Sequence, residues 1–497
     1  MTTMHDRQRD AILPPLDHIF HPNVIAVVGL STDRDKAWLS ECYITPMHEM
    51  GFRGRLYVIN PKGGHIAGLP VYPSLQEVPE PVDYVVSLVP ARHTPQLLEE
   101  CIGKGVKVVQ FYTAGFAETG EEEDAKLQER LVETARRSGV RLLGPNCMGI
   151  YYPKSGLGFC PDFPKESGPI GLLCQSGGNT GHIVRSVAAR GLRFSKVVSY
   201  GNAGDINERD ILDYLTDDSE TQVVAAYIEG TTDGRHLLKC LAKAASRKPV
   251  IVLKGGCTKA GVRAAATHTG SLAGADAVWD GLFKQVGAIR VGSVEEMADL
   301  LVAMLQMRAP RGLSTCIVGI GGGANVLATD DCEQVGLSLP PLPRPIAARV
   351  QRIIPRAGAM LRNPIDAFPL IGSPGGWREL IAILHDWEEL DLILFQNALG
   401  TPPLPPRYEN IAPAVEPMLS AVAGCRLPFA LVWHSITNDD SWQASRKVQE
   451  MCIEGGLPFF VSMRGAALAM RRILAFHSSI RGTVCTVGPP QMPVASC

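Results

Sequence analysis

The sequence predicts an α/β protein of about three domains, each built on a parallel sheet. Short runs of β-branched and aliphatic residues recur along the chain, most of them end at glycine, proline or asparagine, and a helical pattern follows. The chain has 497 residues, which suffices for three cores at about 150 residues per domain. We therefore expect domains at residues 1–150, 151–308 and 309–497.

Composition and charge are those of an ordinary globular protein. Hydrophobic residues make up 45% and charged residues 20%, and 48 Lys and Arg balance 50 Asp and Glu. This balance gives no general attraction to nucleic acid, so local groups have to hold any anionic ligand.

The 13 cysteines are scattered without a C-x-x-C pair, which favours reduced thiols and argues against a disulfide framework or a zinc site. Met1 to Phe20 lacks the apolar core of a signal peptide, and no apolar run reaches about 18 residues. We therefore expect a cytoplasmic protein with no membrane-spanning segment and no metal site of its own.

The first domain opens with a strand over residues 23–29, the turn Gly29-Leu30-Ser31 and a helix that begins before Lys36. A strand, a glycine turn and a helix start offer backbone N–H groups to an anion. The second strand, residues 55–60, leads to Lys62, where an NAD site carries an acidic residue for the ribose. A lysine there favours a ligand with an additional phosphate, as in coenzyme A or NADP. Because no second glycine completes a pyrophosphate fingerprint, NADP is the less favoured of the two.

Further strand and helix units complete the first domain. Strands are expected at residues 83–89, 106–112 and 140–143, and a charged helix at residues 121–138. The strands end at Pro90, at Thr113-Ala114-Gly115 and at Gly144-Pro145-Asn146-Cys147. Loops at the carboxyl ends of parallel strands bind ligands in open α/β sheets, although each glycine or proline also fits an ordinary turn.

A segment rich in proline and glycine, residues 151–168, is expected to link the first domain to the second. The second domain opens with a strand over residues 169–175, the turn Ser176-Gly177-Gly178 and a helix to Ala189. The serine hydroxyl and glycine amides at this helix start form a candidate phosphate cradle. A capping serine followed by turn glycines is the alternative interpretation.

Glu229 and His268 are the candidate catalytic residues of the second domain. Strands are expected at residues 194–200, 222–228 and 250–254, and Glu229 ends the second of them, at the carboxyl edge of the sheet. His268 lies among glycines and small hydroxyl residues, before a helix expected from Leu272 toward Gln285. A neutral imidazole is nucleophilic near neutral pH, and a carboxylate that accepts one N–H leaves the other nitrogen to attack. A solvated histidine and a solvated carboxylate are the alternatives.

The third domain repeats the same pattern after a helix expected at residues 294–306. It begins with a strand over residues 315–320, the turn Gly321-Gly322-Gly323 and a helix from Ala324 to Val335. Its later strands and its two proline-rich connectors are expected at residues 390–396, 429–434 and 458–462, and at residues 340–345 and 402–406.

Four motifs, in this order, resemble the NDP-forming acyl-CoA synthetases, which include ADP-forming acetyl-CoA synthetase and the succinyl-CoA synthetase α subunit. The motifs are Gly-Pro-Asn-Cys-Met-Gly at 144–149, Gln-Ser-Gly-Gly at 175–178, Tyr-Ile-Glu-Gly at 227–230 and His-Thr-Gly-Ser-Leu-Ala-Gly at 268–274. The resemblance covers residues 20–470. It implies an N-terminal Rossmann-like CoA-binding domain followed by two flavodoxin-like α/β domains.

The resemblance also implies roles for individual residues. His268 matches the phosphohistidine of the family, Glu229 matches the residue that orients it, and Ser176, Gly177 and Gly178 match the phosphate-binding turn. The residues that would contact CoA are Gly29, Ser31, Lys36, Lys62, Pro90, Thr113 and Asn146. The segment at residues 31–38 lacks the proline and the later glycine that are usual in the CoA loop of the family.

The implied reaction interconverts acyl-CoA, phosphate and a nucleoside diphosphate with a carboxylic acid, CoA and the triphosphate, through an acyl phosphate and a phosphohistidine. Because the sequence shows no ATP-grasp domain, the chain resembles an α-type subunit. The implied partner is an ATP-grasp β-type subunit that binds ADP or ATP with Mg²⁺, and we expect a hetero- or homo-oligomer. The alternatives are a CoA-dependent acyl or carbamoyl transferase without NTP formation and a non-catalytic CoA-binding subunit.

Overall fold

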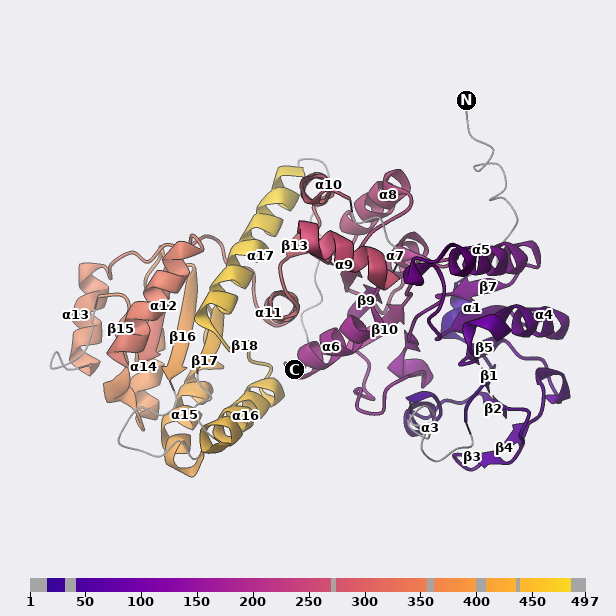
Figure 1. Cartoon of the computed structure of the whole chain (residues 1–497). Coiled ribbons are helices and arrows are strands. Elements are labelled where there is room, and N and C mark those ends of the chain that lie inside the picture. Colours follow the sequence, from indigo (N-terminus) through magenta and orange to yellow (C-terminus); the bar gives the residue numbers. More distant parts are fainter. Residues whose placement is uncertain are drawn as a thin grey trace. The chain divides into compact units, whose positions relative to one another are not determined.

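The computed structural model describes residues 16–31, 42–269, 274–354, 362–398, 408–434 and 439–483. The chain forms two compact units, of which the first comprises Met1–Ala188 with Leu192–Val294 and the second Ala189–Gly191 with Glu295–Cys497 (Figure 1). Three sheets, mostly of parallel strands, confirm the predicted α/β class. The first unit holds two of these sheets, and the predicted division into three domains stays a prediction.

The first sheet has seven strands in the order β3-β4-β2-β1-β5-β6-β7, and only β3 and β4 pair antiparallel. The strands are β1 (Val24–Val28), β2 (Arg55–Ile59), β3 (His65–Ile66), β4 (Leu69–Tyr72), β5 (Tyr84–Ser87), β6 (Val108–Phe111) and β7 (Arg141–Leu143). All five residues of the central β1 are buried, as expected in a parallel sheet. The strand order reverses direction between β1 and β5, where a Rossmann-type sheet binds its ligand.

Short helices and two long ones accompany this sheet. They are α1 (Asp17–Phe20), α3 (Thr45–Glu49), α4 (Thr94–Lys104), α5 (Glu122–Arg137), and the 3-10 helices η2 (Leu75–Glu77), η3 (Ala91–His93) and η4 (Ala117–Thr119). The predicted charged helix is confirmed as α5. Its first turn is acidic and its last turn basic, which complements the helix dipole at both ends.

The second sheet has the order β13-β12-β11-β9-β10-β8, in which only β8 runs antiparallel to its neighbour. Its strands are β8 (Gly149–Tyr151), β9 (Ile170–Cys174), β10 (Phe194–Ser199), β11 (Val223–Ile228), β12 (Val250–Lys254) and β13 (Ile289–Val291). Its helices are α6 (Gly177–Ala188), α7 (Glu208–Asp217), α8 (Gly234–Ala245), α9 (Lys259–Thr269), α10 (Asp276–Val286) and η5 (Pro153–Ser155). The five parallel strands have the flavodoxin order, which reverses between β9 and β11.

The second sheet differs from expectation in two details. The expected linker, residues 151–168, is packed against the domain: Tyr151 ends β8 at the sheet edge, and Phe159 and Phe163 pack edge to face in the core. Burial of aromatic area outweighs the turn preference of the intervening prolines and glycines. The helix expected from Leu272 begins instead at Asp276, and His268 lies in the last turn of α9.

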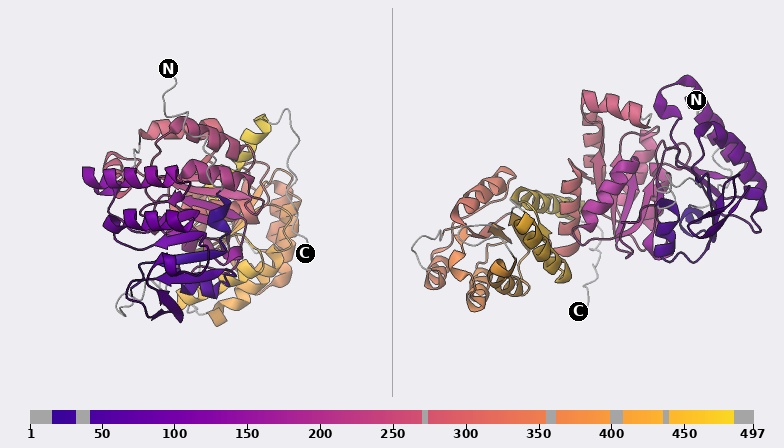
Figure 2. Two further views of the ribbon diagram at one scale, coloured as in Figure 1. Left: turned by 90° about the vertical axis from the view of Figure 1, so that its right-hand side faces the viewer. Right: turned by 60° about the horizontal axis from the view of Figure 1, so that its bottom comes forward.

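The second unit contains a parallel sheet in the flavodoxin order β15-β14-β16-β17-β18. The strands are β14 (Thr315–Ile320), β15 (Ile365–Asp366), β16 (Leu392–Ala398), β17 (Phe429–His434) and β18 (Phe459–Phe460). The helices are α11 (Val294–Gln306), α12 (Gly322–Gln334), α13 (Arg344–Ile353), α14 (Pro374–His385), α15 (Tyr408–Val422), α16 (Asp439–Glu454), α17 (Met463–Thr483) and η6 (Phe368–Leu370). Figure 2 shows helices on both sides of this sheet.

The connectors of this unit differ in part from expectation. Pro345 lies in the first turn of α13 rather than in an extended connector, because proline is well tolerated at a helix start, where its missing N–H is not needed. Residues 402–406 lie outside the described residues. Among the described helices, none is long and apolar enough to cross a membrane.

A buried ion pair joins the two sheets of the first unit. Arg141 in β7 donates from Nε to Asp205 Oδ2 at 2.9 Å, and Asp205 lies in the loop after β10. The two side chains are only 7% and 6% exposed. Asp205 Oδ2 also accepts the backbone N–H of Leu142 at 3.0 Å, so one carboxylate satisfies two donors of the neighbouring sheet.

We expect Asp205→Ala to lower the free energy of unfolding by about 3 kcal/mol, because it leaves the buried Arg141 guanidinium without its closest carboxylate. The exposed pair of Arg137 and Glu133 on α5 provides the control, since Glu133→Ala should cost less than about 1 kcal/mol. Urea denaturation of the full chain, followed by circular dichroism, measures both. Equal losses in the two variants would contradict a structural role for the buried pair.

Candidate functional site

The carboxyl ends of β9 and β11 meet where the second sheet reverses its strand order. Cys174 pairs with Tyr227, so the residues that follow each strand lie side by side. Gln175 Oε1 accepts the N–H groups of Glu229 at 2.7 Å and Gly230 at 3.2 Å. The candidate phosphate turn after Gln175 and the candidate carboxylate therefore occupy adjacent positions on one edge.

The structure brings Glu229 and His268 into direct contact. His268 Nδ1 lies 3.0 Å from Glu229 Oε1 and 3.2 Å from Oε2. A carboxylate only accepts, so Nδ1 carries the proton and Nε2 keeps its lone pair. The Glu229 side chain is 4% exposed and also accepts from Tyr227 Oη at 3.0 Å, whereas the His268 side chain is 50% exposed. The buried Glu229 carboxylate thus orients a His268 imidazole that solvent reaches.

The hydrogen bond to Glu229 raises the pKa of His268 above its ordinary value. Partial burial opposes the rise, and the charges of Glu229 and Glu118 add to it. The stabilisation from this contact is therefore complete below the unfolded pKa and is lost as pH rises through the folded pKa. The neutral, nucleophilic ring becomes abundant only above that raised value.

Lys254 contacts the backbone of Glu229, and the sequence analysis does not predict it as a site residue. Its Nζ donates to the Glu229 carbonyl at 2.7 Å and to the Gly255 carbonyl, and it lies 4.9 Å from the ring centroid of Trp279 on α10. Burial lowers the pKa of Lys254. The two carbonyl acceptors and the indole face stabilise its charged ammonium form. A lysine at the end of an otherwise apolar strand was the available signal. Lys254 is a positioning residue, because it acts through Glu229.

Helix α9 also contacts η4, which follows β6 of the first sheet. Asn146 Nδ2 lies 3.5 Å from the His268 carbonyl oxygen and 3.3 Å from Asn202 Oδ1. Asn202 Nδ2 in turn donates to Glu118 Oε2 at 2.5 Å and to Gln128 Oε1 at 3.0 Å. This chain of amides and carboxylate joins the carboxyl edges of both sheets of the first unit at His268.

The candidate phosphate turn begins α6. Ser176 is buried, and its Oγ accepts the N–H of Asn179 at 3.3 Å, so this serine does cap the helix. The first N–H groups of a helix have no acceptor within it, and Gly177 and Gly178 provide them here. A side chain at Gly177 would lie 2.7 Å from Met148 Cγ, whereas a Cβ at Gly178 would meet open space. Capping and anion binding are therefore compatible at this turn.

The predicted CoA residues of β1 and β2 lie at the carboxyl edge of the first sheet. Gly29 has a φ of +94°, and a Cβ there would come within 3.0 Å of the Val89 backbone nitrogen, so only glycine fits. Asn60 Nδ2 donates to the Leu30 carbonyl at 2.7 Å, and its Oδ1 accepts the N–H of Lys62 at 2.9 Å. This turn leaves the Lys62 side chain exposed at the edge.

The remaining predicted CoA residues follow β5, β6 and β7 along the same edge. Thr113 Oγ1 donates to the carbonyl preceding Pro90 at 2.7 Å, and the Asn146 N–H donates to the Thr113 carbonyl at 3.1 Å. Of these residues, Asn146 reaches His268, whereas Ser31 follows β1, which β5 and β6 separate from β7. Lys36 lies outside the described residues. The placement fits an elongated ligand, and the contacts of each residue with CoA stay a prediction.

We expect Glu229→Gln to lower the pKa of His268, because the variant removes the charge that stabilises the imidazolium. Nuclear magnetic resonance titration of the His268 ring in the full chain measures the change. Tyr227→Phe is the matched control: it removes a neighbour of the carboxylate but keeps the charge, and should move the pKa much less. A His268 pKa that stays the same in Glu229→Gln would contradict this account.

Comparisons with known proteins agree with this geometry. A family model described as a CoA binding domain matches residues 23–153, and one described as a succinyl-CoA ligase like flavodoxin domain matches residues 167–304. The α subunit of acetate–CoA ligase (ADP-forming) I from Pyrococcus furiosus is 39% identical over 330 residues, which are 65% of this chain and 71% of the relative. Acetate–CoA ligase (ADP-forming) I from Archaeoglobus fulgidus is 37% identical over 384 residues, which are 76% of this chain and 54% of the relative.

A solved structure is similar over most of the chain. It is the dinucleotide forming acetyl-coenzyme A synthetase 1 of Candidatus Korarchaeum cryptofilum in complex with phosphate and ADP. The TM-score is 0.78 at 29% identity, and the match covers 95% of this chain and 99% of that chain.

Proposed function

Because the chain belongs to the family of ADP-forming acyl-CoA ligases, we propose that it acts as the α-type part of such an enzyme, with His268 as phosphoryl carrier. The reaction interconverts acyl-CoA, phosphate and a nucleoside diphosphate with a carboxylic acid, CoA and the triphosphate. The observation that carries the proposal is the half-exposed His268, oriented by the buried Glu229 and held where the edges of two sheets meet. Relatives named for acetate support a small carboxylic acid as substrate.

The proposed reaction has three transfers. An oxygen of phosphate attacks the thioester carbonyl, the C–S bond breaks, and CoA leaves as a thiolate that takes up a proton. His268 Nε2 then attacks the phosphorus of the acyl phosphate, and the P–O bond to the acyl group breaks to release the carboxylate. In the last transfer the P–N bond breaks as an oxygen of the nucleoside diphosphate takes the phosphoryl group.

Glu229 assists each transfer at His268. When Nε2 is phosphorylated and Nδ1 still carries its proton, the ring is positive, and the carboxylate 3.0 Å away stabilises that charge. The same hydrogen bond keeps the lone pair on Nε2 in the resting state. Amides of Gly177 and Gly178 at the start of α6 would bind the transferring phosphoryl group, and CoA would lie along the first sheet from Lys62 to Asn146.

The proposed partner is an ATP-grasp subunit of β type, which would bind ADP or ATP with Mg²⁺. The name of the Pyrococcus furiosus relative, a subunit alpha, supports a partner chain. The chain would supply the carrier, and the partner would supply the nucleotide and its metal ion.

Incubation of the full chain with an acyl-CoA and radiolabelled phosphate, without any partner, should label the protein, with acetyl-CoA as the first substrate. The label should resist alkali and be lost in acid, as a P–N bond is, and His268→Asn should abolish it. His48→Asn is the matched control, because His48 is exposed on α3 and should leave the label unchanged. A label that persists in His268→Asn would rule out this carrier.

Lys62→Ala should raise the KM for CoA about tenfold, equivalent to about 1.4 kcal/mol, with little change in kcat. The reason is loss of one cation near the ribose phosphate, so dephospho-CoA should bind both proteins equally. Lys107→Ala serves as control, since Lys107 is exposed at the opposite, amino-terminal end of β6. An equal defect with CoA and dephospho-CoA would show that Lys62 does not contact that phosphate.

A further inference from the structure

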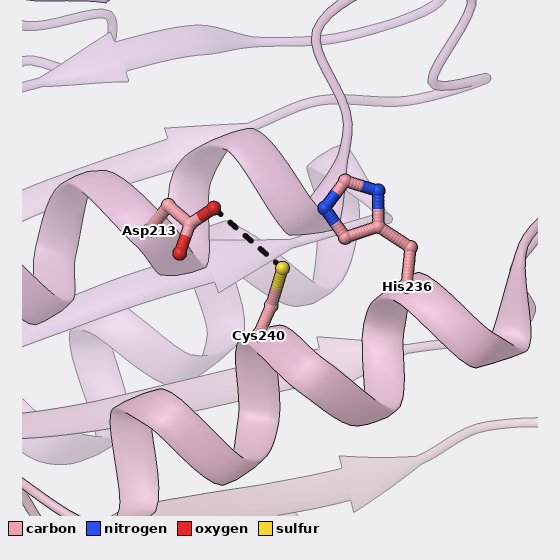
Figure 3. A group of neighbouring side chains, drawn as sticks. All are labelled: Asp213, His236 and Cys240. Atoms are coloured by element: carbon pink, nitrogen blue, oxygen red, sulfur yellow. Dashed lines mark hydrogen bonds between the residues drawn. The ribbon is translucent and has the colours of Figure 1, made fainter. Parts of the chain in front are cut away.

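Three metal-ligating side chains lie together on helices that the proposed reaction does not use. Asp213 comes from α7, and His236 and Cys240 come from α8, where a separation of four residues places them on one face (Figure 3). One ligand atom from each residue lies within 4.8 Å of the other two. Among the described residues this is the one such group of three.

The geometry of the group is close to that of a metal site. Cys240 Sγ lies 3.6 Å from Asp213 Oδ2, which is about the sulfur-to-oxygen separation around a tetrahedral zinc ion with Zn–S near 2.3 Å and Zn–O near 2.0 Å. In Figure 3 one ring nitrogen of His236 faces this carboxylate and thiol.

Neighbouring residues contact the ligand side chains on the sides that face away from the group. Lys243 Nζ binds the other oxygen of Asp213, Oδ1, at 3.1 Å, which leaves Oδ2 toward the thiol. Arg209 Nη1 lies 3.4 Å from His236 Nδ1, so the nitrogen facing the group is Nε2. Asp233 accepts from Arg209 at 3.1 Å and caps α8 through the N–H of His236 at 3.0 Å. Such outer contacts orient ligands in known metal sites.

We propose that Asp213, His236 and Cys240 bind a divalent transition-metal ion, for which Zn²⁺ is the best match, with water in the fourth position. One thiolate, one imidazole and one carboxylate form a set that zinc accepts, and their two negative charges neutralise the ion. On binding, the Cys240 thiol releases its proton to solvent. Metal bound at Nε2 would place the imidazole proton on Nδ1, so Arg209 would no longer donate to that nitrogen and would keep its contact with Asp233.

The site would clamp α7 to α8 next to the loop that carries Glu229. That loop runs from the end of β11 to Asp233, the N-cap of α8, and Thr231 within it donates to Glu208 at the start of α7 at 2.6 Å. Metal bound between the two helices would therefore steady the α8 end of the Glu229 loop and the α7 residue that Thr231 contacts, without touching the reacting groups.

Titration of the chelator-treated full chain with Zn²⁺ by calorimetry should show one site. Co²⁺ as a probe should give the absorption band of a thiolate ligand. His236→Asn and Cys240→Ser should each weaken Zn²⁺ binding at least about 100-fold, and Lys243→Met about tenfold. Because Cys240 is buried and its replacement can impair folding, the variant His236→Asn, at a half-buried position, keeps the test decisive.

Two control variants test whether zinc binds at this site rather than at another thiol or at His268. Cys425 Sγ lies 3.6 Å from His385 Nε2, but no third ligand completes that pair in the described part of the chain, so Cys425→Ser should leave zinc binding unchanged. His268→Asn should also leave it unchanged, which keeps this outcome independent of the proposed phosphoryl transfer. No binding by the unsubstituted chain, or full binding by His236→Asn, would overturn the proposal.

Discussion

The hydrogen bond between Glu229 and His268 Nδ1 is the contact on which the rest of the site depends. It needs a carboxylate that is almost wholly buried and held in a fixed place, and the neighbouring residues hold the backbone of Glu229. Gln175 binds the backbone N–H groups of Glu229 and Gly230, and the Lys254 ammonium binds the Glu229 carbonyl. The reversal of strand order between β9 and β11 brings these groups together. The fold of the second sheet therefore also determines which nitrogen of the His268 imidazole carries the proton.

The same histidine connects two sheets that are separate in sequence. Asn146 and Asn202 bridge their carboxyl edges, and Gly201 lets the loops approach, because a Cβ there would lie 2.3 Å from the carbonyl oxygens of Pro145 and Asn146. The buried pair of Arg141 and Asp205 lies a few residues away from this bridge. Close backbone packing and a satisfied ion pair therefore fix the distance between the proposed CoA edge and the proposed phosphate turn.

Strands and the central residue pair were predictable from sequence, whereas the supporting contacts were not. Hydrophobic runs gave β12, β14 and β17 with correct ends, and the position of Glu229 after a buried strand predicted its place at the edge. The small residues around His268 suggested a loop, but the preceding alanine-rich stretch extends α9 through it. Lys254 had a local signal, a lysine at the end of an apolar strand, but its contact with Glu229 and the contacts of Asn202 join segments that are distant in sequence, which local patterns do not reveal.

His268 lies at the end of a helix rather than within an open loop, and this position determines which contacts hold its backbone. Carbonyl groups in the last turn have no intrahelical donor, and for His268 that role falls to Asn146 at 3.5 Å, a long and weak bond. Apart from the contact of Nδ1 with Glu229, one weak backbone contact would hold a phosphorylated ring at the helix end. A small movement of the last turn of α9 would therefore shift the phosphoryl group while the rest of the helix keeps its place.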